Sequence, residues 1–214
     1  MRDIIARRTD LETGRWVEII RDFDFPVHPL RDEEWDGILT LTPRYSAYGN
    51  DSDNDPRKEA FQKYLRAVRI YGGVSIPIYC LEHGGITFSA GSFADPWDSG
   101  IAGFAWMPPA KVKEIFKGDK KAAIAYLKQM ISVMDAYAQG ECYGYALYDT
   151  DGSEVWQTSG FWNIDGRWDE LMTEMADSVP EDFAPLIKNC WYGELDELVE
   201  IPSRFYVPGF APAV

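Results

Sequence analysis

Cysteine is scarce in this chain of 214 residues, which contains only Cys80, Cys142 and Cys190. An odd and widely spaced set of cysteines does not provide the disulfide framework of a small secreted domain. We therefore expect free thiols and a reducing compartment.

Long apolar runs are also missing. No stretch approaches the ~18 apolar residues that a membrane-spanning helix needs. The first sixteen residues, MRDIIARRTDLETGRW, lack the apolar run of a secretory signal peptide. The sequence predicts a cytoplasmic protein that does not engage a membrane.

The motifs of nucleotide-binding enzymes are absent as well. The chain contains neither G-x-x-x-x-G-K-[ST] nor G-x-G-x-x-G, the glycine-rich loops that hold phosphates. It also lacks G-x-S-x-G, the strand-to-helix turn that exposes a nucleophilic serine in many hydrolases. No cofactor is predicted.

Metal-binding patterns are incomplete. Cys80 and His83 have the C-x-x-H spacing that supplies half of a zinc site, but no second pair of ligands follows and His28 is distant. A free cysteine usually packs as a small apolar residue. We therefore predict that Cys80 is buried and that the chain holds no metal.

A second incomplete pattern is that of a calcium loop. Asp51, Asp53 and Asp55 stand at alternate positions, as the first three ligands of such a loop do. Pro56 occupies the position that requires glycine, and Gln62 the position that requires a bidentate glutamate. We interpret this segment as an acidic surface loop.

The sequence does contain the material of a folded core. It is 46% hydrophobic and 14% aromatic, with eight Trp and twelve Tyr, and such a surplus of Trp and Tyr is typical of interfaces. Strand and helix patterns are mixed without regular βαβ alternation. This predicts an α+β fold with a mixed, largely antiparallel sheet whose hairpins pack against two or three helices. We expect a single domain over residues 1–214, with residues 165–214 as its acidic C-terminal extension.

Local patterns predict the individual elements. Gly84-Gly85 and Asp151-Gly152 are expected to form hairpin turns, Asp119 is expected to cap the longest helix, and Pro77 indicates an edge position or a bulge. Strands are expected at residues 16–23, 38–41, 74–81, 86–90, 101–107, 142–149 and 153–158. Helices are expected at residues 56–71, 110–116, 120–139 and 166–179.

Charge is the most unusual feature, because the formal net charge is −14. Residues 165–200 hold eleven acids against two bases, whereas residues 111–128 hold six lysines against two acids. A helix face of one sign is typical of a nucleic-acid mimic or of a ligand for a basic groove. The alternative is a solvated surface that only keeps the protein soluble. The residues predicted to bind a partner are Asp169, Glu170, Glu174, Asp177, Glu181 and Asp182.

A polar cluster around His83 is a second candidate site. If the hairpin brings His83 to Asp98, with Ser99 beside it, the pair provides a general base and its orienting carboxylate. The alternative is structural. His83 then bonds backbone groups of its own turn, Asp95 and Asp98 accept backbone N–H groups in Asx turns, and Trp97 anchors the loop.

Three segments resemble a family of proteins carried by bacteriophages, prophages and conjugative elements. They are EWDGILTLTPRYSAYGND (34–51), IPIYCLEHGGITFSAGSFADPWDSGIAGFAWM (76–107) and MDAYAQGECYGYALYD (134–149). The family has W-D-N-x-G-x-M, Y-D-H-S-G-I-T, P-W-D-S-G and Y-D-x-Y-L-x-G-x-V-Y-G-Y segments, and the match is sharpest at residues 96–100. Leu81-Glu82 stands where the family has Tyr-Asp, and Gly84 where it has Ser.

This resemblance implies a mobile-element origin and a bacterial cytoplasm. Small acidic proteins of such elements are often anti-restriction or anti-CRISPR inhibitors, and many of them imitate the charge of DNA. The hypothesis is an acidic protein that binds and inhibits a host defence complex through its basic nucleic-acid-binding surface, without catalysis and without binding nucleic acid itself. The alternative is a small hydrolase or nucleotide-processing enzyme that uses His83 and Asp98.

Overall fold

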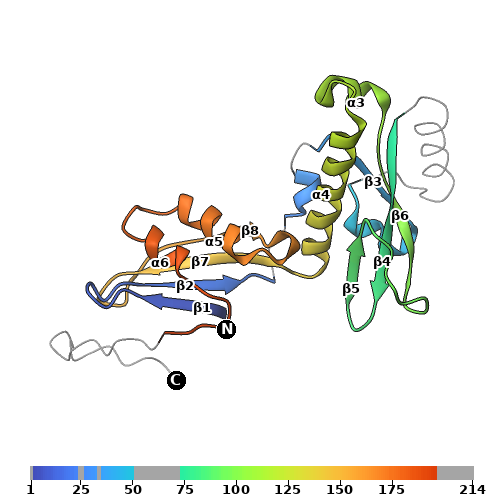
Figure 1. Cartoon of the computed structure of the whole chain (residues 1–214). Helices are drawn as coiled ribbons and strands as arrows, with labels where there is room; N and C mark the ends of the chain where they lie inside the picture. Colours follow the sequence, from blue (N-terminus) through green and yellow to red (C-terminus); the bar gives the residue numbers. More distant parts are fainter. Residues whose placement is uncertain (1, 24–26, 33–34, 51–72, 197–214) are drawn as a thin grey trace. The chain divides into compact units, whose positions relative to one another are not determined.

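The computed structural model describes residues 2–23, 27–32, 35–50 and 73–196 (Figure 1). The chain divides into two compact units, Met1–Phe25 with Cys142–Val214 and Pro26–Glu141. The sequence predicted one domain, whereas the first unit is built from both ends of the chain and the second from the residues between them. The predicted helix at 56–71 and the candidate calcium loop of Asp51, Asp53 and Asp55 lie outside the described residues.

The first unit contains an antiparallel sheet with the strand order β1-β2-β7-β8. Its strands are β1 (Asp3–Thr9), β2 (Trp16–Arg21), β7 (Cys142–Tyr148) and β8 (Glu154–Trp162). The short 3-10 helix η3 (Ile164–Gly166) leads to helices α5 (Trp168–Asp177) and α6 (Ala184–Lys188). Both helices lie on one face of this sheet (Figure 1).

The core of the first unit lies between that sheet face and the two helices. Strand alternation directs every second side chain of β2 and β7 toward the helices. The buried cluster includes Val17, Ile19, Tyr143, Tyr145, Leu147, Leu171, Met172, Met175, Phe183 and Ile187. Burying a side chain of this size stabilises a fold by about 1.5–3 kcal/mol. The predicted acidic extension therefore contributes to the core of this unit through apolar side chains of α5, α6 and the residues around them.

The second unit contains another antiparallel sheet, with the strand order β3-β6-β4-β5. Its strands are β3 (Ile38–Leu41), β4 (Val74–Glu82), β5 (Ile86–Ser89) and β6 (Ser99–Met107). The helical segments are α1 (Pro29–Asp32), η1 (Pro43–Tyr48), α3 (Pro109–Phe116) and α4 (Lys120–Ala138). Helix α4 packs against β4, β5 and β6. Two antiparallel sheets with packed helices confirm the predicted α+β fold.

Local signals explain the elements that hold the second candidate site. Asp119 caps α4 by accepting hydrogen bonds from the backbone N–H groups of Lys121 and Ala122. Strands β4 and β5 form the predicted hairpin, with Glu82 opposite Ile86. Pro77 lies on the part of β4 that pairs only with β6, next to a register irregularity at residues 78–79, which explains how a central strand accommodates it.

A search of the described residues found no helix with both the length and the apolar character needed to cross a membrane.

Candidate functional site

Strand pairing places His83 close to Asp98. Strands β4 and β6 pair up to Leu81 opposite Ser99, and the backbone N–H of Glu82 then donates to the carbonyl oxygen of Asp98 at 2.8 Å. The two loops therefore leave the sheet side by side. Because main-chain register sets this approach, the proximity of the two side chains does not depend on their own interaction.

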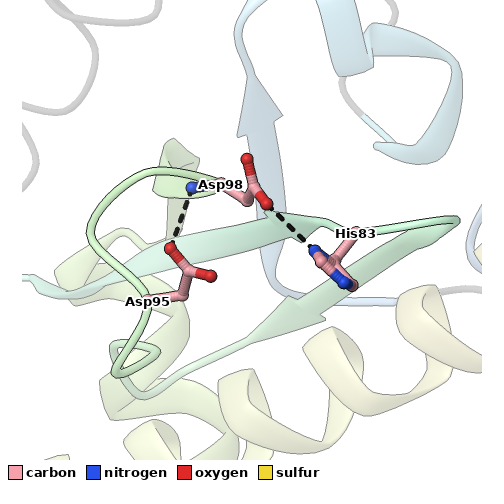
Figure 2. A group of neighbouring side chains, drawn as sticks. All are labelled: His83, Asp95 and Asp98. Carbon is pink, nitrogen blue, oxygen red and sulfur yellow. Dashed lines mark hydrogen bonds and ion pairs between the residues drawn. The ribbon is translucent and has the colours of Figure 1, made fainter.

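The side chains of His83, Asp95 and Asp98 converge beyond the ends of these strands (Figure 2). The His83 Nδ1 atom lies 3.0 Å from Asp98 Oδ2. Asp95 Oδ1 accepts the backbone N–H groups of Trp97 at 2.8 Å and of Asp98 at 3.1 Å. One nitrogen or carboxylate oxygen from each of the three residues lies within 4.8 Å of the others.

The residues of this loop differ in whether they follow the predicted catalytic arrangement or the predicted structural one. Asp95 forms the predicted Asx turn, whereas the carboxylate of Asp98 faces His83. Trp97 is 91% exposed and so does not anchor the loop. The Ser99 hydroxyl donates to the main-chain carbonyl of Asp95. The structure thus brings His83 and Asp98 together but directs the Ser99 hydroxyl to the backbone.

Cys80 and His83 do not share a site. Cys80 is buried, as predicted, and its Sγ lies 3.4 Å from the hydroxyl of Tyr45, while the imidazole of His83 is exposed. Within the described part of the chain, the group of possible metal ligands that includes His83 contains no cysteine. The C-x-x-H spacing therefore does not correspond to half a zinc site.

A cavity of about 380 Å³ lies against the same hairpin turn. The Tyr45 hydroxyl donates to Glu82 Oε1 at 2.6 Å, and Arg44 forms an ion pair with the same carboxylate. This pairing balances the charges in the cavity wall. The lining residues are Arg44, Tyr45, Tyr48, Glu82, Gly84, Gly85 and Ile86.

The two histidines of the chain have opposite electrostatic environments. The hydrogen bond between the His83 imidazole and the Asp98 carboxylate, together with the charge of that carboxylate, raises the pKa of His83, and the charge of Asp95 raises it further. Burial lowers the pKa of His28, and the positive charge of Arg31 lowers it too. His28 Nδ1 accepts the backbone N–H of Leu30 at 3.2 Å, a role that requires an unprotonated nitrogen.

We expect the two imidazoles to titrate on opposite sides of the ordinary histidine pKa of 6.5. The His83–Asp98 pair stabilises the fold below pH 6.5, and this contribution is lost as the pH rises through the raised pKa. Buried His28 favours the folded state above pH 6.5, and stability falls as the pH drops toward its lowered pKa. A proton NMR titration of the imidazole C–H signals measures both, with His83→Gln assigning the resonances. Two histidines that titrate together would contradict these environments.

The predicted acidic residues lie on and just after α5. The apolar face of α5 packs into the core through Leu171, Met172, Met175 and Ala176. The opposite face carries the acids, as a helix period of 3.6 requires. All six predicted partner-binding residues are exposed: Asp169, Glu170, Glu174, Asp177, Glu181 and Asp182.

Half of these acids already have basic neighbours. Glu170 pairs with Arg167 at 2.5 Å, and Asp182 pairs with Arg15 at 2.5 Å. Asp177 lies 4.0 Å from Lys188. Among the described residues, the carboxylates of the other three, Asp169, Glu174 and Glu181, form no ion pair. These three carry most of the uncompensated charge of the face.

Two exposed aromatic residues that follow α6 were not predicted from the sequence as part of a site. Trp191 is 64% exposed and Tyr192 is 58% exposed. The ring of Tyr192 packs edge-on against Trp168 at the start of α5, with centroids 5.1 Å apart. A Trp-Tyr pair directly before Gly193 is the local signal that could have identified them, because aromatic residues in an exposed turn are unusual in a region this rich in acids.

Comparisons of the chain with protein-family models, curated proteins and solved structures found no match.

Proposed function

We propose that the protein is an acidic inhibitor that binds the basic nucleic-acid-binding surface of a bacterial host defence complex. The observation that carries this proposal is the placement of six exposed acids on and after one helix whose opposite face is buried. The apolar face of the helix packs into the core, so the acids project from a backbone that this packing holds in place. The resemblance to proteins of phages and conjugative elements supports the choice of a host defence complex in the bacterial cytoplasm.

The acids on α5 are spaced more widely than the phosphates of nucleic acid. Glu170, Glu174 and Asp177 follow an i, i+4, i+7 stripe, which at 1.5 Å per residue extends over ~10 Å. One strand of duplex DNA carries a phosphate every ~3.4 Å along the axis, so about four phosphates span the same length. The stripe thus has a charge density somewhat below that of one strand and well below that of the full duplex. Arg167 and Lys188 reduce its charge further.

Aromatic contacts would supply affinity that charge alone does not. Exposed ion pairs are each worth less than about 1 kcal/mol, whereas Trp and Tyr dominate binding energy at the centres of interfaces. The exposed pair Trp191 and Tyr192 lies beside the start of α5. In such a binding surface, the acids attract the partner and the aromatic side chains become buried on contact.

Affinity capture from a bacterial lysate rich in defence systems tests the proposal. The tagged protein is expected to retain a nuclease or surveillance complex in stoichiometric amounts at low salt and to release most of it at high salt, because screening weakens exposed charge pairs. Mass spectrometry identifies the retained proteins. Retention that is insensitive to salt, or of proteins without a basic surface, would contradict the proposed mode of binding.

The second candidate function is hydrolysis or nucleotide processing at His83. The observations that favour it are the 3.0 Å contact between His83 and Asp98 and the cavity of about 380 Å³ beside the same turn. Orientation by a carboxylate is what a histidine general base requires. A screen of phosphate and ester substrates measures this activity, and His83→Ala should remove it. Full activity in that variant would exclude His83 as the base.

A further inference from the structure

We infer that His83, Asp95 and Asp98 form a binding site for a divalent transition-metal ion of the zinc class. One ligand atom from each residue lies within 4.8 Å of the other two, and the ligands come from the two loops that strand pairing holds together. The site lies in the second unit, away in sequence from α5, so it does not depend on the proposed inhibitor function.

The distances suit coordination after a small adjustment. Two ligands at ~2.1 Å from a tetrahedral ion are ~3.4 Å apart. The separation of 3.0 Å between His83 Nδ1 and Asp98 Oδ2 is close to that value. The longest separation, up to 4.8 Å, closes by rotation of the exposed side chains of His83 and Asp98 toward the fixed carboxylate of Asp95. No movement of the strands is needed.

Asp95 is already oriented for this role. Backbone N–H groups of Trp97 and Asp98 occupy one of its carboxylate oxygens, so the carboxylate is held in one direction and its other oxygen remains available as a ligand. Hydrogen bonds that fix a ligating carboxylate are a regular feature of metal sites, where they reduce the ordering that binding requires.

A divalent cation would neutralise the local charge. Two carboxylates and a neutral imidazole sum to two negative charges, which one divalent ion neutralises. Within the described ranges, no lysine or arginine forms an ion pair with Asp95 or Asp98, and Arg44 pairs instead with Glu82. Among the described side chains, His83 is therefore the only group that can supply a positive charge to Asp95 and Asp98.

The ligand set selects the type of ion. A nitrogen with two carboxylate oxygens suits Zn²⁺ and related transition metals, whereas Ca²⁺ and Mg²⁺ take oxygen ligands almost exclusively. Three protein ligands leave at least one position for water, as in catalytic zinc sites. A metal-bound water is a stronger acid than bulk water, so the site would provide a nucleophile that does not require the Ser99 hydroxyl.

Titration of the metal-free, full-length protein with zinc chloride at neutral pH tests this site. The imidazole C–H NMR signals of His83 are expected to shift while those of His28 stay unchanged. Calorimetry should show an affinity at least ~10-fold lower in His83→Gln and in Asp95→Asn. Both substitutions keep hydrogen-bonding groups, and Asn at position 95 retains the oxygen that accepts the backbone N–H groups.

The matched control is Asp151→Asn. Asp151 also accepts a backbone N–H in a hairpin turn, from Ser153 at 2.9 Å, and it lies outside the cluster, so its zinc affinity should equal that of the unchanged protein. Amide NMR spectra verify the fold of each variant. Shifts at both histidines or at neither, or a His83→Gln affinity within about threefold of the unchanged protein, would overturn the site.

Discussion

Replacement of Asp169, Glu174 and Glu181 by lysine is expected to weaken binding to the captured partner by about 100-fold. These are the acids of the face whose carboxylates form no ion pair among the described residues, so they present the most charge to a basic surface. One exposed pair changes an affinity by about 1 kcal/mol at most, but each reversal replaces an attraction with a repulsion. Three such changes amount to roughly two orders of magnitude, measured by equilibrium titration of the partner.

A second triple variant distinguishes the effect of the charge on the α5 face from the effect of the net charge of the protein. Lysine at positions 3, 114 and 154 replaces Asp3, Glu114 and Glu154, which are also exposed, and changes the net charge of −14 by the same amount. If the acidic face of α5 makes the contact, this control should stay within about tenfold of the unchanged protein, because exposed charges that do not contact the partner are largely screened by salt. Equal losses in the two triple variants would mean that net charge, and not the face, governs binding.

Replacement of Gly103 by alanine is expected to lower the unfolding free energy of the second unit by about 3 kcal/mol, at the upper end for overpacked sites. Gly103 lies in β6, opposite Leu41 of β3 and Ile78 of β4. An added Cβ would lie 2.2 Å from the carbonyl oxygen of Thr40 and 2.8 Å from the Cα of Leu41. Backbone atoms in the middle of a sheet cannot move aside as a flexible side chain can, so the strands must separate locally.

Gly100 provides the matched control on the same strand. A Cβ added there meets no atom within 4 Å, so Gly100→Ala should change the unfolding free energy by no more than about 0.5 kcal/mol. Urea unfolding followed by tryptophan fluorescence and circular dichroism compares the two variants. Similar stabilities for Gly103→Ala and Gly100→Ala would show that β3 and β6 do not approach as closely as the structure has them.

The elements that the sequence predicted correctly are those with strong local signals. Asp119 begins α4 and an Asp-Gly turn joins β7 to β8 because a helix cap and a tight turn each depend on only a few adjacent residues. Strand β1 was not predicted. A register irregularity between Ile4 and Ala6 interrupts its alternation of buried and exposed side chains, which removes the period of two that identifies a strand.

The division into two units could not be read from the sequence. Strand β2 pairs with β7, so that Trp16 lies opposite Tyr148, and no local pattern reports a pairing between residues so far apart. The helix α6 was also missed. It has only five residues, too short for a periodic pattern, and it is stabilised by packing of Ile187 into the core.

The candidate sites were predictable to different degrees. A hairpin signal beside His83 made its approach to Asp98 a reasonable hypothesis, since paired strands bring their flanking loops together. The third member, Asp95, follows His83 in the same polar cluster of the sequence, and its alternative role, bonding the backbone, is one that it also fulfils. The sequence showed that acids spread along α5 and the segment after it, but the face that they occupy and the pairing of Asp182 with Arg15 depend on tertiary structure. The folded structure was therefore needed to identify the acids that form no ion pair with a described basic residue.

Competition between duplex DNA and the protein for the captured partner tests the proposed mimicry most directly. Increasing DNA is expected to displace the protein, and the protein is expected to displace labelled DNA, because both would occupy one basic surface. The variant with lysine in place of Asp169, Glu174 and Glu181 should fail to displace DNA at the same concentrations. Simultaneous binding of DNA and protein to the partner, with neither affecting the affinity of the other, would contradict the proposal.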